Sequence, residues 1–90
     1  MRIWAKLIRD NHLMGDYLVE NPRKDTRTHK IFQALDEVCH YFDLGQPIWL
    51  KNNISDFQEH AKTRFTQDSF IEDIPFDYME FQVIEEDDFL

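Results

Sequence analysis

Residues 31–42 read IFQALDEVCHYF, and the spacing of their apolar side chains decides the class of fold. The apolar positions recur at i, i+3, i+4, i+7 and i+8, which is the single buried stripe of an α-helix. The stripe consists of Ile31, Ala34, Leu35, Val38, Cys39 and Phe42. Asp25, Thr26 or Thr28 can cap the start of this helix through a side-chain oxygen. Leu44-Gly45 predicts its end, because glycine adopts the left-handed conformation easily.

The residues before this helix predict a β-hairpin. From Met1 to Ile8 apolar and polar side chains alternate, as they do in a strand with one buried face. Asp10-Asn11-His12 supplies turn residues, and Leu13 to Glu20 returns as a second strand with Gly15 as a candidate bulge. Trp4 breaks the alternation, which suggests that a partner or the C-terminal segment covers part of the second face.

The residues after the helix predict a connector, a second helix and a closing strand. Pro47-Ile48-Trp49-Leu50 is short and apolar, so we expect an ordered connector that plugs the core. A second helix follows from Phe57, Ala61 and Phe65, which recur at i, i+4 and i+8. Alternation returns from Phe76 to Glu85 and predicts the last strand.

Length and composition indicate one small domain. Ninety residues are too few for two independent cores, and 14% of them are aromatic, which supplies large side chains for one core. We therefore predict an α+β domain over residues 1–90, with a three-stranded antiparallel sheet, two helices on one face and the order ββααβ. Residues 85–90 are expected to form a frayed, solvated acidic tail.

The compartment is predicted from what the sequence lacks. Cys39 is the single cysteine, which excludes an intramolecular disulfide and a cysteine-rich zinc site. The N-terminal residues contain no apolar run of signal-peptide length, so we predict neither a signal peptide nor a membrane span there. We therefore expect a cytoplasmic protein.

The charge of the chain is unevenly distributed. The net charge is −8, which disfavours direct binding to nucleic-acid phosphates or to anionic membranes. Residues 1–45 are neutral, whereas residues 46–90 hold three basic and eleven acidic side chains. The expected partner is an unidentified protein, with a basic surface as the simplest match for this acidity.

Two charged segments and one aromatic residue are the candidate contacts. A basic cluster surrounds the predicted start of the first helix and could bind an anion or pair with the acidic half of the chain: Arg23, Lys24, Arg27 and Lys30. The acidic run near the C-terminus could dock on a basic protein, with Phe89-Leu90 as an apolar anchor: Glu85, Glu86, Asp87 and Asp88. Trp4 is the candidate aromatic contact.

Cofactor and metal chemistry have little support in the sequence. Gly15 and Gly45 are the only glycines and lie thirty residues apart, so no phosphate-binding loop is present and no cofactor is expected. Asp36 and His40 are i, i+4 neighbours that could supply two metal ligands, but two ligands do not make a site. No residue is assigned a catalytic role.

Four segments resemble an uncharacterised family of short bacterial proteins of about 90 residues. These segments are Ile3 to Asn11, Pro47 to Leu50, Thr63 to Ile71 and Phe76 to Glu80. The resemblance implies a bacterial, cytoplasmic, stand-alone domain. It transfers no functional residue, since that family has no assigned activity.

Three classes of function remain open. The preferred class is a non-enzymatic protein-interaction module with an acidic surface. The alternatives are an acidic mimic of nucleic acid that inhibits a DNA- or RNA-binding protein, and a small enzyme that uses dispersed carboxylates and histidines. Surface geometry separates them, because a concave polar pocket favours catalysis and an exposed apolar patch favours assembly.

The position of Cys39 in the apolar stripe generates a first prediction. The thiol should react slowly with a thiol reagent in the native protein and rapidly in denaturant. Cys39→Ser should lower the free energy of unfolding by about 1–3 kcal/mol, because a hydroxyl would be buried without an assured partner. Rapid labelling of the native protein would contradict this.

Overall fold

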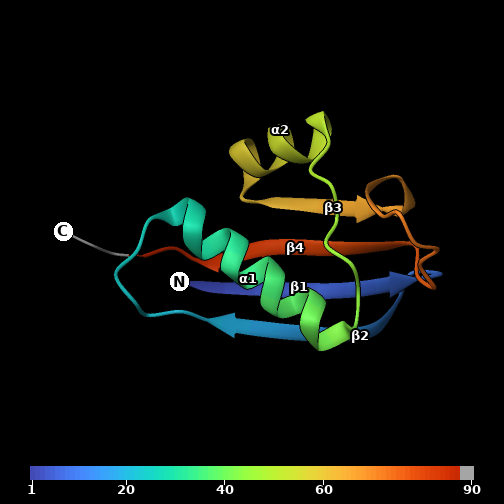
Figure 1. The fold of residues 1–90 in the computed structure, drawn as a ribbon, viewed down its shortest axis with the longest axis horizontal. Helices are drawn as coiled ribbons and strands as arrows, with labels where there is room; N and C mark the ends of the chain where they lie inside the picture. Colours follow the sequence, from blue (N-terminus) through green and yellow to red (C-terminus); the bar gives the residue numbers. More distant parts are fainter. Residues whose placement is uncertain (88–90) are drawn as a thin grey trace.

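The structure is a computed structural model and describes residues 1–87. In chain order its elements are β1 (Arg2–Arg9), β2 (His12–Glu20), α1 (Arg27–Phe42), α2 (Lys51–His60), β3 (Lys62–Thr66), the 3₁₀ turn η1 (Gln67–Ser69) and β4 (Tyr78–Glu85). The strands form one antiparallel sheet in the order β2-β1-β4-β3 (Figure 1). The predicted α+β class is confirmed, but the sheet has four strands rather than three, and the order is ββααββ rather than ββααβ.

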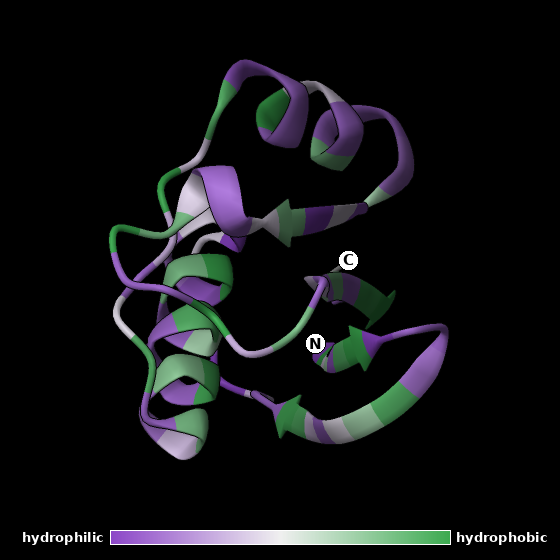
Figure 2. Ribbon diagram, turned by 90° about the vertical axis from the view of Figure 1, so that its right-hand side faces the viewer, coloured by the Kyte–Doolittle hydropathy of each residue, from purple (hydrophilic) through white to green (hydrophobic). Residues whose placement is uncertain are grey.

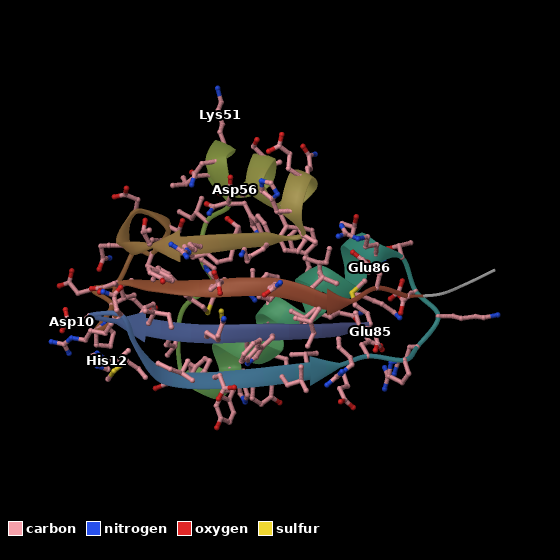
Figure 3. All side chains as sticks on the ribbon, turned by 180° about the vertical axis from the view of Figure 1, so that it is seen from behind. Asp10, His12, Lys51, Asp56, Glu85 and Glu86 are labelled. Atoms are coloured by element: carbon pink, nitrogen blue, oxygen red, sulfur yellow. The ribbon has the colours of Figure 1, made fainter. Side chains whose placement is uncertain are left out.

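The two helices occupy different places relative to the sheet. Helix α1 lies across one face, whereas α2 lies beside the edge strand β3 (Figures 1 and 2). Both contribute to the same core, since Phe57 of α2 stacks on Phe81 of β4 with ring centroids 5.8 Å apart. Within the described residues no helix lies over the opposite face of the sheet, and Figure 3 views the molecule from that side.

The prediction that the second helix continues to Phe65 is wrong. Helix α2 ends at His60, and Ala61 takes a left-handed conformation with φ 55°. The next five residues form β3, in which Thr63 and Phe65 are buried and Lys62, Arg64 and Thr66 are not. The i, i+4 spacing of Ala61 and Phe65 is also compatible with a turn followed by alternation. Pairing with β4 decides between the two.

The first helix begins as predicted and ends two residues earlier than expected. Thr26 is the N-cap, and its hydroxyl oxygen accepts a hydrogen bond from the His29 N–H at 3.2 Å. The left-handed C-cap is Asp43, with φ 55°, and not Gly45. Aspartate tolerates this conformation better than most residues. In residues 1–87 neither helix combines the length and the apolar content needed to cross a membrane.

The N-terminal hairpin follows the predicted pattern. Asp10 and Asn11 form a two-residue turn with φ 51° and 65°. Two residues with positive φ give the turn a twist that matches the strands it joins. The register then shifts between Leu7 and Ile8, so that Met14 is the extra residue of a bulge beside Gly15.

The core lies between α1 and the sheet and is largely aliphatic and aromatic. Trp49 of the connector lies half-buried among aromatic rings, with centroids 5.4 Å from Phe57 and 5.0 Å from Phe65. The connector therefore does plug the core. Cys39 is 2% exposed, as predicted, and burial raises the pKa of its thiol to about 11, with smaller contributions from nearby carboxylates.

The conformation of Ala61 generates a second prediction. Ala61→Gly should raise the free energy of unfolding by about 0.5–1 kcal/mol, because glycine adopts positive φ without steric strain. Urea unfolding measures this change. Ala34→Gly is the matched control in the middle of α1, where loss of the side chain should be destabilising. A loss of stability in Ala61→Gly would contradict the assigned helix end.

Candidate interaction surfaces

The two ends of the chain meet in an ion cluster next to α1. Asp87 accepts hydrogen bonds from the Met1 amino group at 2.7 Å and from Lys30 Nζ at 2.8 Å. Both cations also donate to the backbone oxygen of Asn21, at 2.9 and 3.1 Å. The Lys30 side chain is 0% exposed, and the Asp87 carboxylate compensates its buried charge. Together these hydrogen bonds lower the pKa of Asp87, with that from Lys30 contributing most.

The preceding residue, Glu86, forms an exposed ion pair with the first residue of α1, Arg27. Its carboxylate accepts two hydrogen bonds from Arg27, one from a terminal nitrogen at 2.8 Å and one from Nε at 3.1 Å. The hydrogen bond from Glu86 raises the pKa of Arg27. Glu85 is the last residue of β4. Glu86 and Asp87 are therefore paired with side chains of the domain, whereas the sequence predicted a solvated tail for this segment. Asp88 and Phe89-Leu90 lie outside the described residues.

The predicted basic cluster is divided by the fold. Arg27 and Lys30 pair with the C-terminal carboxylates, which is the intramolecular role considered for this cluster. Arg23 lines a polar pocket of about 450 Å³ between the end of β2 and α1, together with Glu20 and Glu37. Lys24 is exposed on the same loop. The four residues therefore do not form one anion site.

Trp4 lies on the open face of the sheet and is half-buried. Its Nε1 donates to Asp16 Oδ2 at 2.8 Å, and Lys6 Nζ lies 4.3 Å from a ring centroid. Arg2, Asp16, Leu18 and Ile84 border a hollow of about 310 Å³ beside this ring. Trp4 is thus placed where a partner could touch it, although other residues of the chain hold its indole in position.

The open face is electrically balanced by cross-strand ion pairs. Glu80 lies 2.9 Å from Lys6 and 3.4 Å from Arg64, and Glu20 lies 3.5 Å from Arg2. Burial alone would raise the pKa of Glu80, but hydrogen bonds from Lys6 and Arg64 outweigh it and lower the pKa. The acidity of the protein is consequently concentrated away from the middle of this face.

One end of the sheet carries an excess of negative charge that Arg9, which lines a hollow there with Ile74 and Asp77, offsets only in part. We call it the acidic end. It consists of the loop 67–77, the β1–β2 turn and the end of α1, with the carboxylates of Asp10, Asp43, Asp68, Glu72, Asp73 and Asp77. Hydrogen bonds join these segments. The Asp10 N–H donates to Asp77 at 2.8 Å, and the Gly45 N–H donates to Glu72 at 2.6 Å. Figure 3 labels Asp10 and His12 at this end.

The loop of the acidic end is held rigidly by the side chain of Gln67. Its Nε2 donates to the Glu72 carbonyl at 2.7 Å, and its Oε1 accepts from the Ile74 N–H at 2.9 Å. Phe70 and Phe76 anchor both ends of the loop in the core, with ring centroids 5.9 Å apart. Between these fixed points Ile71 is 95% exposed, the largest exposure among the big apolar residues described.

A second apolar surface lies between the helices. A groove of about 350 Å³ separates α1 from α2, with Phe32 and Ile54 exposed along it and Trp49 and Phe57 among its lining residues. Arg27 lies at this groove, 5.6 Å from the Phe57 ring centroid, and carries Glu86. The groove is shallow and combines apolar and charged groups.

Metal ligands are not gathered into a site in the described part of the chain. Among residues 1–87 no group of three or more His, Cys, Asp or Glu side chains could hold a metal ion. Asp36, one of the two residues considered as ligands, accepts a hydrogen bond from Gln46 at 2.8 Å.

Comparison with protein-family models, curated proteins and solved structures gave no significant match. The resemblance to a bacterial family therefore stays a prediction, and the surfaces themselves carry the functional argument. Sequence reasoning did not single out Ile71, because one apolar residue among acidic ones looks like a core position until the loop is seen. The sequence does show the acidity around it, in Glu72-Asp73 and in the absence of Lys or Arg from 67–77.

The Asp87 cluster generates a third prediction, which concerns acid stability. The folded-state pKa of Asp87 lies below its usual value, so its stabilising contribution is present above that usual value, near pH 4, and disappears as the pH falls through the folded-state pKa. Asp87→Asn should therefore be less stable than wild type at neutral pH, and the difference should shrink below pH 4. Urea unfolding at several pH values measures this. An Asp87→Asn difference that is independent of pH would contradict the role of this carboxylate.

Proposed function

We propose that the protein is a non-enzymatic interaction module that uses its acidic end to bind a basic surface on a partner protein. The single observation that carries this proposal is Ile71, which is 95% exposed at the tip of a loop held by hydrogen bonds at both sides. A rigid loop that places an isoleucine in water gains no folding stability from that side chain. The same arrangement suits an apolar anchor for a partner, since no ordering of the loop is needed on binding.

Charge around Ile71 supports a basic partner. Residues 67–77 hold four carboxylates and no Lys or Arg. Asp68 and Asp73 make no side-chain hydrogen bond or ion pair within residues 1–87, so they are available to a partner's cations. Complementary charge at the rim of an interface accelerates association and selects the partner, while the central apolar contact supplies much of the affinity.

We place this module in the cytoplasm as part of the same proposal. A nucleic-acid mimic is the alternative that uses the same acidity. Competition separates the two, because DNA or RNA would displace a mimic from its partner.

The fourth prediction tests the acidic end. Tagged wild type and Ile71→Ser are compared in capture of proteins from a bacterial lysate at low and high salt. Ile71→Ser should lose the captured partner and keep the wild-type free energy of unfolding within about 0.5 kcal/mol, as expected for an exposed side chain. The double variant Asp68→Asn/Asp73→Asn should capture less partner and respond less to salt, because it has fewer charges to be screened.

Ile54→Ser is the matched control. Ile54 is 46% exposed and lies at the groove between the helices, so its loss removes an exposed isoleucine outside the acidic end. Capture that depends on Ile54 and not on Ile71 would move the binding site to the groove. Capture that is released by added DNA or RNA would favour the mimic.

A further inference from the structure

Strand β2 leaves one edge of the sheet open. It is the terminal strand in the order β2-β1-β4-β3 and pairs with β1 alone. At the opposite edge α2 lies beside β3, whereas no element of residues 1–87 lies on the outer side of the C-terminal half of β2 (Figure 1). We infer that this half of β2 docks an extended, basic segment of a partner protein by strand addition. The inference rests on the proposed function and names a second contact for the same basic partner.

The backbone groups that face outward can be assigned from the pairing with β1. Met1 and Asn21 exchange both backbone hydrogen bonds, at 2.9 Å each. In an antiparallel pair such positions alternate with positions whose N–H and C=O point away from the neighbour. The register therefore turns three β2 residues outward, opposite Lys6, Trp4 and Arg2: Asp16, Leu18 and Glu20.

These three residues also supply side chains of a definite pattern. They occupy alternate positions, so their side chains share the open face of the sheet. Glu20 lies 3.5 Å from Arg2, but its side chain is 66% exposed, so this surface ion pair leaves it accessible to a second cation. Asp16 accepts a hydrogen bond from the neutral Trp4 indole and keeps its negative charge, and Leu18 is 39% exposed. An added antiparallel strand would place one residue directly opposite each of them. The complementary sequence is a basic residue, any residue, an apolar residue, any residue and a second basic residue.

The other flank of the edge is aromatic. Tyr17 of β2 stacks on Tyr41 of α1 with ring centroids 4.3 Å apart, and Tyr41 is 59% exposed. The intervening residues of an added strand would point toward this flank. Apolar or β-branched side chains at those positions would pack against the two rings.

A second copy of this chain is a poor occupant of the same edge. Antiparallel pairing of two copies about Leu18 would set Asp16 of one copy opposite Glu20 of the other, twice. Like charges directly opposite one another destabilise a strand pair. The acidic side chains thus disfavour self-association and favour a basic strand, in the way that charged edge strands are commonly protected.

The fifth prediction uses two synthetic peptides with blocked ends. The basic probe is Thr-Lys-Thr-Val-Thr-Lys-Thr, and the acidic probe has Glu in place of both Lys. Each peptide is titrated into the ¹⁵N-labelled 90-residue protein, and the amide chemical shifts are followed by NMR. The basic probe should shift the amide signals of residues 16–20. The acidic probe should bind at least about tenfold more weakly, which corresponds to 1.4 kcal/mol.

Variants of β2 separate backbone pairing from side-chain contact. Leu18→Pro removes one outward N–H and should weaken the basic probe by about fivefold or more, since proline is tolerated at the free side of an edge strand. Leu18→Thr keeps that N–H and is its control. Asp16→Lys/Glu20→Lys should reverse the preference between the two probes.

Several outcomes would overturn the inference. They are equal affinity for both probes, amide shifts centred outside β2, and a dimer in sedimentation that Leu18→Pro dissociates. Failure here is distinguishable from failure of the proposed function. If Ile71-dependent capture persists while the basic probe does not bind β2, the interaction module stands and the docking edge is wrong. If the probe binds β2 while capture ignores Ile71, the docking edge stands and the acidic end is wrong.

Discussion

The pairing of β1 with β4 is the constraint on which the rest of the structure depends. These two strands form the middle of the sheet, yet they come from opposite ends of the described chain, with Ile3 opposite Val83 and Leu7 opposite Met79. Strands β2 and β3 are attached to this pair from outside. The core under α1 is therefore complete only when the C-terminal strand is in place, and pairing between residues so distant in the chain slows folding because a long loop must close.

The ion cluster at Asp87 is a consequence of the same pairing. Once β4 runs antiparallel to β1, the residues after it pass the amino terminus and the first turn of α1. Burying Lys30 is unfavourable unless a carboxylate accompanies it, and Asp87 supplies that carboxylate. Part of the acidic run near the C-terminus, Glu86 and Asp87, therefore forms ion pairs within the molecule.

The ion pairs within the molecule determine which acidic surfaces stay accessible to a partner. Basic side chains on the open face and at the start of α1 are paired with Glu20, Glu80, Glu86 and Asp87. The loop 67–77 has no basic residue of its own, and hydrogen bonds fix it with Ile71 facing water. The acidic end presents carboxylates beside an apolar group, and the β2 edge adds Asp16 and the exposed, only weakly paired Glu20 beside Leu18. This is the chemistry that a basic, partly apolar partner matches.

The sequence by itself determined the elements whose pattern is local. The stripe from Ile31 to Phe42 specifies α1, and Asp10-Asn11 specifies the hairpin turn, because each depends on neighbours within a few residues. Only the tertiary structure decided β3, since a five-residue strand such as Lys62–Thr66 exists through its hydrogen bonds to β4. It likewise decided the partners of Lys30, the exposure of Ile71 and the open edge of β2. Each of these depends on which distant segments are adjacent in space, and periodicity along the chain carries no record of that adjacency.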